Sequence, residues 1–207
     1  TILITGASGG IGSAICDKFF HNNYTLVLTA SSDEKLNILS KKYGNKHYYY
    51  KIDLSNHDNI QQCLEIVTKD HKDISVIVNN AGITHLPKPL EDVSEEEFDK
   101  VFSVNSKSVY FCGKFFVPHM KRNKKGSILN VASTAGLSPR PNLNWYNASK
   151  GWMITATKTM AVELAPHKIR VNALAPVAGE TPLLKSFLGE DTQERREAFL
   201  STIPLGR

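Results

Sequence analysis

The sequence predicts an α/β protein built on a doubly wound parallel sheet with helices on both faces. Strand-like and helix-like segments alternate from end to end, the strand-like segments are short apolar runs, and a glycine-rich turn follows the first of them. Apolar strands of this kind are typical of a sheet covered on both faces, and right-handed crossovers then give the doubly wound arrangement. The 207 residues fit one domain spanning 1–207.

The strands are the β-branched and aromatic runs that end at turn residues. The first runs into a glycine turn, and the fourth, Ile74 to Val78, is apolar except for Ser75. Such runs of four to eight residues read as strands. We expect strands at 2–5, 24–29, 47–52, 74–78, 127–131 and 169–174.

The helices are the amphipathic stretches between the strands. Ser94 and Glu97 form a capping-box pattern at the start of the fourth helical stretch. Beyond Thr181 apolar residues recur at helical spacing, so residues 177–203 are expected to form amphipathic helices that act as a substrate loop or lid. The other helices are expected at 11–21, 33–43, 56–69, 94–122 and 144–164.

Composition excludes several classes of protein. The net charge of +5 comes from scattered Lys and Arg residues, and the densest cluster, 121–125, falls at a helix end, where cations complement the helix dipole. Because the cations are scattered, nucleic-acid binding is not expected. A membrane span is not expected either, because no apolar run approaches ~18 residues. Cys16, Cys63 and Cys112 show no metal-ligand spacing. We expect buried or half-buried thiols, no metal and a cytoplasmic location.

The turn from Thr5 to Gly12 indicates a nucleotide cofactor. Glycines allow close approach of a ligand to the backbone, and the helix behind them presents free N–H groups to a pyrophosphate. The second strand ends in Thr29 to Ser32, with no carboxylate until Asp33. An acidic residue at that place would bind a ribose 2′-hydroxyl and repel a 2′-phosphate. The hydroxyls and nearby Lys35 therefore favour NADP(H), with NAD(H) possible.

Seven segments, taken in order, resemble the motifs of the short-chain dehydrogenase/reductase family, and the resemblance covers essentially the whole chain. It implies a Rossmann fold and a hydride exchanged between a nicotinamide and a carbonyl or secondary alcohol. The motif residues begin with the turn from Thr5 to Gly12 and continue with Asp53-Leu54, Asn79 to Gly82, Asn105, Ser133, Tyr146 to Lys150, and Pro176 to Thr181. In the last segment Val177 replaces the family's glycine.

The resemblance implies two sets of site residues. The catalytic set is Asn105, Ser133, Tyr146 and Lys150. The cofactor-binding set is Gly6, Ser8, Gly10, Ile11, Gly12, Ser31, Ser32, Asp53, Leu54, Asn80, Ala81, Gly82, Tyr146, Lys150, Pro176 and Thr181.

The catalytic set also makes physical sense. A tyrosine has an unperturbed pKa of ~10, so it needs a neighbour that stabilises the phenolate. Lys150 lies one helical turn after Tyr146, on the same face, and its ammonium supplies that stabilisation. Tyr146 then serves as acid in reduction and base in oxidation. A tyrosine and a lysine at this spacing, with no other motif beside them, would more often lie on an exposed helix face.

The other two members have structural alternatives. Ser133 follows the fifth strand and could hydrogen-bond a substrate oxygen, or it could cap a turn. Asn105 has a poor helix propensity and could mark a kink or a satisfied buried amide; the family assigns it to a proton relay. His85 could line the substrate mouth or lie on the surface. Trp145 could wall the entrance, and Trp152 could belong to packing or an interface.

Within the family the chain looks most like the bacterial 3-oxoacyl-acyl-carrier-protein reductases. Residues 29–32, 79–84 and 203–207 carry that impression. The substrate would then be a small carbonyl or an acyl thioester, with acyl carrier protein as a candidate partner. The family resemblance also implies a homotetramer paired through residues 107–120 and 146–164. The alternatives are a sugar, polyol or other small-alcohol dehydrogenase, and a non-catalytic NADP-binding regulator. We also expect that the family's C-terminal strand is missing from the sequence.

Overall fold

Six parallel strands form one sheet in the order β3-β2-β1-β4-β5-β6. This is the architecture of the computed structural model, which describes residues 1–203. Starting from β1 in the middle, the chain winds outward to β3, then returns to β4 and winds out to β6, as expected of a doubly wound sheet. The strands are β1 (Ile2–Ile4), β2 (Leu26–Ala30), β3 (Tyr48–Lys51), β4 (Val76–Asn79), β5 (Gly126–Val131) and β6 (Ile169–Leu174).

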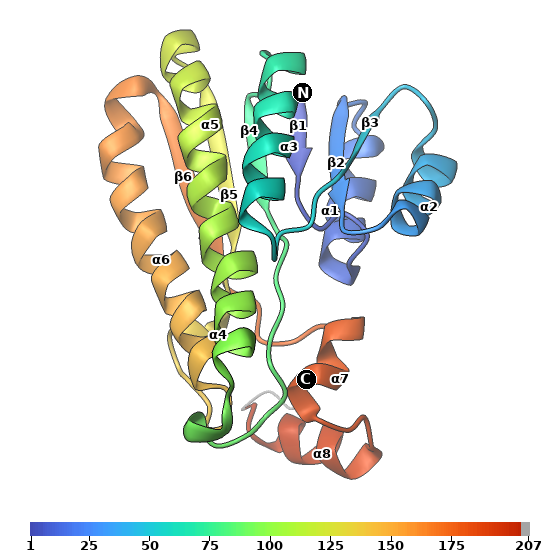
Figure 1. Ribbon diagram of the computed structural model, residues 1–207, viewed down its shortest axis with the longest axis vertical. Helices are drawn as coiled ribbons and strands as arrows, with labels where there is room; N and C mark the ends of the chain where they lie inside the picture. Colours follow the sequence, from blue (N-terminus) through green and yellow to red (C-terminus); the bar gives the residue numbers. More distant parts are fainter. Residues whose placement is uncertain (204–207) are drawn as a thin grey trace.

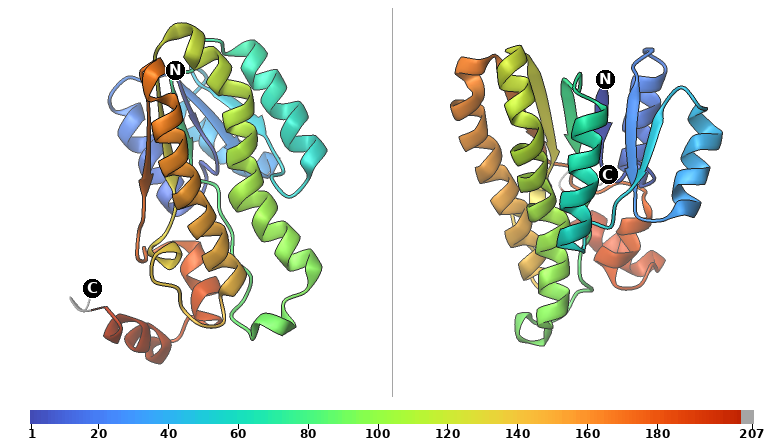
Figure 2. Two further views of the ribbon diagram at one scale, coloured as in Figure 1. Left: turned by 90° about the vertical axis from the view of Figure 1, so that its left-hand side faces the viewer. Right: turned by 45° about the horizontal axis from the view of Figure 1, so that its top comes forward.

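Helices cover both faces of the sheet. In Figure 1, α3, α5 and α6 lie side by side on one face, and Figure 2 shows α1 on the other; α2 contacts the outer strands β2 and β3. The helices are α1 (Gly10–Phe20), α2 (Asp33–Tyr43), α3 (His57–Asp70), α4 (Glu95–Phe102), α5 (Ser108–Asn123), α6 (Asn144–Leu164), α7 (Pro182–Leu188) and α8 (Gln193–Ser201). Every strand and helix expected from the sequence is present, with ends shifted by two residues at most.

Local chemistry explains where the elements start and how deeply they are buried. Ser32 and Asn56 cap α2 and α3 through their side chains, and the capping box of Ser94 and Glu97 forms as predicted at α4. All residues of β1 and β2 are buried. Two apolar cores follow, one on each face of the sheet.

The helix expected over 94–122 is interrupted. Residues Ser103–Lys107 form one turn of π-helix between α4 and α5. Such turns are often found at functional sites, and this one contains Asn105. The regular α-helix is therefore interrupted at this asparagine.

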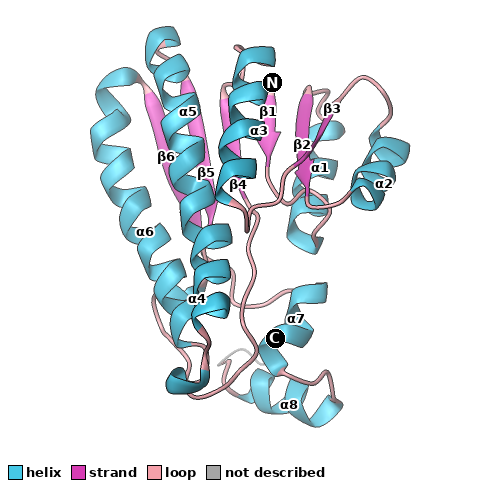
Figure 3. Ribbon diagram, viewed as in Figure 1, coloured by secondary structure: helices cyan, strands magenta, loops and turns pink. Residues whose placement is uncertain are grey.

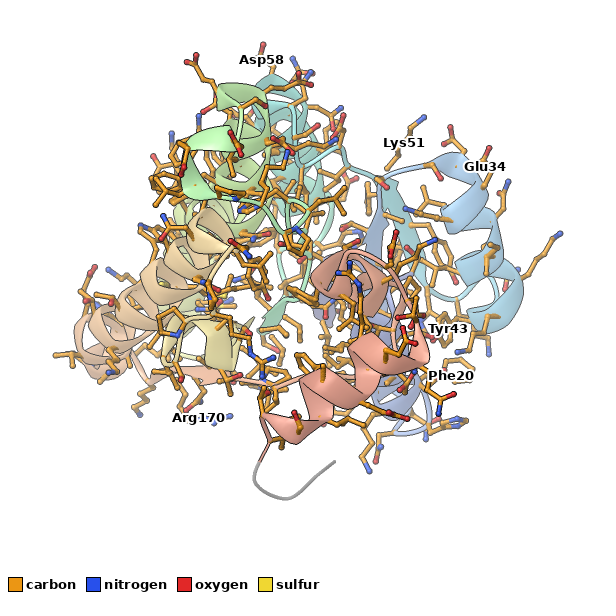
Figure 4. The ribbon with its side chains drawn as sticks, turned by 90° about the horizontal axis from the view of Figure 1, so that it is seen from below. Phe20, Glu34, Tyr43, Lys51, Asp58 and Arg170 are labelled. Atoms are coloured by element: carbon orange, nitrogen blue, oxygen red, sulfur yellow. The ribbon has the colours of Figure 1, made fainter. Side chains whose placement is uncertain are left out.

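The last two helices lie beyond the carboxyl ends of the strands. Figure 3 shows α7 and α8 below the sheet, where the view of Figure 1 places the strand ends, and Figure 4 shows them in the foreground when the molecule is seen from below. These are the helices expected after Thr181. The segment Pro204 to Arg207, part of the resemblance to 3-oxoacyl reductases, lies outside the described residues.

The structure also tests the predictions for the cysteines and for a membrane span. Cys16 and Cys112 are buried and Cys63 is partly buried, all as free thiols, which confirms the expectation. Burial raises the pKa of the Cys16 and Cys112 thiols to about 12. Among residues 1–203, no helix is long and apolar enough to cross a membrane.

Candidate active site

A cavity of about 690 Å³ opens at the carboxyl-terminal edge of the sheet. It is lined by the loops that follow all six strands and by α7. In an open α/β sheet this edge, next to the point where the strand order reverses, is where ligands bind. Of the predicted cofactor residues all but Ser32 line it, and of the predicted catalytic residues all but Asn105 do.

Three glycines shape the turn between β1 and α1. Gly6 has a φ of +63°, and an added Cβ there would lie 2.8 Å from the Ala81 Cα. A Cβ at Gly12 would lie 2.3 Å from the Gly6 carbonyl oxygen, and one at Gly10 2.5 Å from the Thr181 Cγ2. No side chain of the described residues caps α1 at Gly9. The turn therefore leaves the N-terminus of α1 facing the cavity, ready for an anionic group.

The loops after β1 and β4 are tied together by hydrogen bonds. The Asn80 Nδ2 donates to the carbonyl oxygens of Thr5 and Gly6, each at 3.0 Å. The Thr5 Oγ1 accepts from the backbone N–H groups of Asn80 and Ala81, each at 3.1 Å. These bonds fix the glycine turn against the centre of the sheet, so the cradle is preformed.

Beyond β2 the cavity wall carries a hydroxyl and a lysine. The Lys35 Nζ donates to the Ser31 Oγ at 3.1 Å, and both residues line the cavity. Ser32, predicted to contact the cofactor, instead caps α2 by accepting from the Lys35 backbone N–H. The first carboxylate after the strand, Asp33, is paired with Lys51 at 2.6 Å and is exposed.

The loop after β3 contributes Asp53 and Leu54 to the cavity. Hydrogen bonds from the Ser55 hydroxyl, at 2.6 Å, and from its backbone N–H, at 2.9 Å, lower the pKa of Asp53. Lys100 of α4 lines the same region and lowers that pKa further by its charge. The sequence had not singled out Lys100, because only the packing of α4 brings it to this loop.

Tyr146 and Lys150 project from the first turns of α6, and both are buried. The Lys150 Nζ donates to the Val131 carbonyl oxygen at 2.8 Å and lies 5.8 Å from the centre of the Tyr146 ring. Burial lowers the pKa of Lys150 to about 8. Burial raises the pKa of Tyr146, while a hydrogen bond with the Ser133 hydroxyl acts in the opposite direction. The protein's own groups therefore hold the phenol neutral.

Ser133 follows β5 and faces Tyr146. Its Oγ also accepts from the Ala135 backbone N–H at 3.1 Å, so it caps the short 3-10 turn Thr134–Gly136. The turn cap is therefore confirmed, and the same residue lines the cavity beside Tyr146, while its hydrogen bond to a substrate oxygen stays a prediction.

Asn105 does not line the cavity; it is fully buried behind it. Its Oδ1 accepts from the Ile83 N–H, and its Nδ2 donates to the Ile83 carbonyl and to the Ser149 Oγ, all at 2.9 Å. An added Cβ at Gly82 would lie 3.2 Å from the Lys150 Nζ and 3.5 Å from the Asn105 Oδ1. The expectation of a satisfied buried amide is confirmed, and glycine at position 82 leaves room for the Lys150 ammonium.

The segment after β6 covers the cavity. The Thr134 N–H donates to the Pro176 carbonyl at 3.0 Å, and Thr181 packs on Gly10. Phe187 of α7 then places its ring 5.0 Å from that of Tyr146, nearly edge to face. The sequence predicted helices here but not this contact, because nothing in the pattern shows which apolar residue faces the tyrosine.

Three other conspicuous side chains lie away from the cavity. His85 is buried rather than on the surface, with its Nδ1 against the Leu86 carbonyl at 2.8 Å and no partner for Nε2 among residues 1–203. Trp145 packs on Phe98 of α4 and does not line the cavity. Trp152 is 40% exposed.

Comparison with known proteins decides the family. The family model described as short chain dehydrogenase matches residues 1–191. The chain belongs to this family. It is thus an NAD(P)-dependent oxidoreductase that acts on CH–OH or carbonyl groups, as the motifs predicted.

Individual relatives point to different substrates. The chain is 37% identical over 209 residues to the 4-formylbenzenesulfonate dehydrogenase TsaC1/TsaC2 of Comamonas testosteroni, covering 99% of this chain and 83% of the relative. It is 39% identical over 208 residues to the 3-oxoacyl-[acyl-carrier-protein] reductase FabG of Thermotoga maritima, covering 99% and 82%. Among solved structures, the 3-ketoacyl-(acyl-carrier-protein) reductase of Brucella melitensis complexed with NADH has a TM-score of 0.89 and 40% identity, covering 100% and 83%.

Proposed function

We propose that this chain reduces a 3-oxoacyl thioester to the 3-hydroxyacyl form with NADPH, on acyl carrier protein in fatty acid synthesis. The observation that carries the proposal is the placement of the Tyr146 phenol, with Ser133 and Lys150 around it, at the end of the cavity that Phe187 covers. Leu183 and Leu184 of α7, the helix that carries Phe187, and Ile83 also line the cavity.

The residues around the phenol divide the chemistry between them. When bound, the nicotinamide supplies or accepts the hydride and, in its oxidised form, a positive charge. Tyr146 gives its proton to the carbonyl oxygen during reduction and takes it back during oxidation. Ser133 holds that oxygen by a hydrogen bond. Lys150, protonated at neutral pH because its pKa of about 8 lies above it, stabilises the phenolate that remains.

The cavity fits a dinucleotide phosphate. Added Cβ atoms at Gly6, Gly10 and Gly12 would fill the cradle in front of α1, and its free N–H groups suit a pyrophosphate. Asp53 and Leu54 would face the adenine. Ser31 and Lys35, together with the absence of a carboxylate at the end of β2, favour the 2′-phosphate of NADP(H) over NAD(H).

The charges on the cavity wall favour an uncharged carbonyl group. Among residues 1–203 the lining cations are Lys35 and Lys100, which lie at the Ser31 and Asp53 end, and Lys150 itself. An aryl sulfonate bound beside Tyr146 would need a further cation, because an unpaired buried charge is strongly unfavourable. The helix α7 contributes a single hydroxyl to the cavity, that of Ser186, and a sugar or polyol would need more polar groups than this helix offers.

The remaining parts of the proposal concern assembly and location. A homotetramer paired through α5 and α6 is supported by the exposed Tyr110, Trp152 and Val162, which are 52%, 40% and 79% accessible, since apolar side chains of this kind often mark contact surfaces. Free thiols at all three cysteines support a cytoplasmic enzyme.

The test is a comparison of substrates and cofactors. We expect loss of NADPH absorbance with acetoacetyl-CoA. The kcat/KM for this substrate should be at least about tenfold above that for 4-formylbenzenesulfonate, cyclopentanone or a keto sugar. The kcat/KM with NADPH should also exceed that with NADH. Preference for the sulfonate or the sugar would overturn the substrate. NADPH binding without turnover of any carbonyl would overturn the enzymatic role and favour a regulator.

A further inference from the structure

Ser149 links two parts of the site without lining the cavity. Its side chain is fully buried on α6, between Tyr146 and Lys150. The Ser149 Oγ accepts from the Asn105 Nδ2 at 2.9 Å and donates to the Tyr146 carbonyl oxygen at 2.7 Å. Because Asn105 also makes two bonds to Ile83, one chain of hydrogen bonds runs from the loop after β4, through the π-helical turn, to the backbone of the tyrosine.

The acceptor of this hydroxyl is significant. A helical serine commonly donates to the carbonyl three or four residues earlier, and here that carbonyl belongs to Tyr146 itself. This carbonyl lies in the first turns of α6, and the side chain of the same residue, Tyr146, lines the cavity. The hydroxyl can therefore set the position of the phenol relative to the loop that carries Gly82, against which the Lys150 Nζ packs.

Two turns later α6 contains a chemical match. The Thr157 Oγ1 accepts from the Asn130 Nδ2 at 2.8 Å and donates to the Met153 carbonyl oxygen at 2.7 Å. Thr157 is buried like Ser149, but its partners do not line the cavity. The same bonding pattern thus occurs once beneath the phenol and once away from it, which provides an internal control.

We propose that Ser149 is a positioning residue for the acid/base pair, holding Tyr146 and Lys150 in register with Asn105. The inference rests on the proposed roles of Tyr146 and Lys150. Loss of the hydroxyl frees the first turns of α6 from the π-helical turn, so the phenol and the ammonium no longer meet the reacting oxygen in a fixed geometry. The Kd for the cofactor should change little, because all of its predicted binding residues except Tyr146 and Lys150 lie outside α6.

The test compares Ser149→Ala with Thr157→Ala in the full chain. We expect Ser149→Ala to lower kcat about ten- to a hundredfold, with the Kd for NADPH within about threefold of the original. In the direction of alcohol oxidation, the pH of half-maximal kcat should move upward, because a poorly aligned Lys150 stabilises the phenolate less. Thr157→Ala should lower the Tm to a similar degree but leave kcat and its pH profile in place.

The outcomes separate the inference from the proposed function. If the unaltered protein turns over no carbonyl, the proposed function fails. If it is active and Ser149→Ala keeps its kcat and pH profile, or if Thr157→Ala changes them equally, the positioning role is wrong. Should Ser149→Ala fail to fold, Ser149→Cys, which keeps a weaker donor on a slightly larger side chain, should show a smaller loss of kcat in the same direction. An unchanged kcat and pH profile in that variant would also overturn the role.

Discussion

The two halves of α6 bury polar groups in different ways. The first half buries Tyr146, Asn147, Ser149 and Lys150. The Ser149 hydroxyl is hydrogen-bonded, but the lysine has a pKa lowered by burial, and the Asn147 Oδ1 has no partner among residues 1–203. The second half buries Thr157, whose hydroxyl both accepts and donates a hydrogen bond. Both halves belong to one helix on one sheet, so the contrast does not come from the fold.

The contrast separates stability from function. A buried amine with a single hydrogen bond costs stability, whereas a satisfied hydroxyl bridge contributes to it. Groups retained at a cost are the ones to assign to chemistry. Removal of the costly buried groups in the first half of α6 should therefore lower activity and can raise stability. Changes in the second half should lower stability and leave activity nearly unchanged.

The largest effect that sharpens this contrast is expected for Lys150→Met. Activity should fall by about a hundredfold or more, while the free energy of unfolding at about pH 7 rises by about 2 kcal/mol, because the buried charge is removed. Burial lowers the pKa of Lys150 from 10.5 to about 8, so the unfolded chain binds more protons between these values. Stability of the unaltered protein should rise through that pH range.

Thermal and chemical unfolding at several pH values check this prediction. In Lys150→Met the rise in stability between about pH 8 and 10 should be absent. A variant that loses stability at neutral pH, or that keeps the same rise, would break the contrast.

The next effect concerns the second half of the helix and has the opposite sign. Asn130→Ala removes the partner of the Asn79 Nδ2 and of the Thr157 Oγ1, each at 2.8 Å. The free energy of unfolding should fall by about 2–4 kcal/mol, because buried polar groups are left unpaired. Activity per folded molecule should change by less than about threefold. A large loss of kcat in well-folded Asn130→Ala would contradict the division.

The smallest effect is expected outside α6, in the segment that covers its first half. Arg196 binds both oxygens of Glu180 at 3.0 and 3.1 Å and also pairs with Asp191, on the surface. Arg196→Gln should raise KM about two- to fivefold with little change in kcat, since exposed ion pairs contribute little. High salt should raise KM of the unaltered protein similarly.

Arg170→Gln serves as the control for that measurement. Arg170 is also exposed (labelled in Figure 4), but it donates to the Ser127 Oγ at 3.2 Å where β5 and β6 begin, at the end of the sheet opposite α7 and α8. Its KM should match that of the unaltered protein. Equal changes in the two variants would argue against residues 177–203 acting as a cover.

How far the sequence predicts this molecule depends on the range of each interaction. Periodicity and the glycine turn predict the sheet, the helices and most of the cavity wall, because those signals are local. The capping box at Ser94 is equally local, and it forms as predicted. The assignment of Ser32 to the cofactor does not match the cavity, because its hydroxyl can cap α2 instead.

The contacts that the sequence does not predict join distant segments. The packing of Phe187 on Tyr146 joins α7 to α6, and the approach of Thr181 to Gly10 joins the segment after β6 to the first turn. The burial of His85 likewise depends on how the loop after β4 is covered. None of these has a periodic or compositional signal, so only the assembled fold shows them.

The most direct test of the account is the activity of Tyr146→Phe beside the unaltered protein, with NADPH and acetoacetyl-CoA. The substitution removes only the hydroxyl, so the protein should bind NADPH normally and remain at least as stable. We expect kcat/KM to fall by about a thousandfold or more. A Tyr146→Phe variant that retains more than about a tenth of the activity would contradict the assignment of the proton donor and with it the central claim.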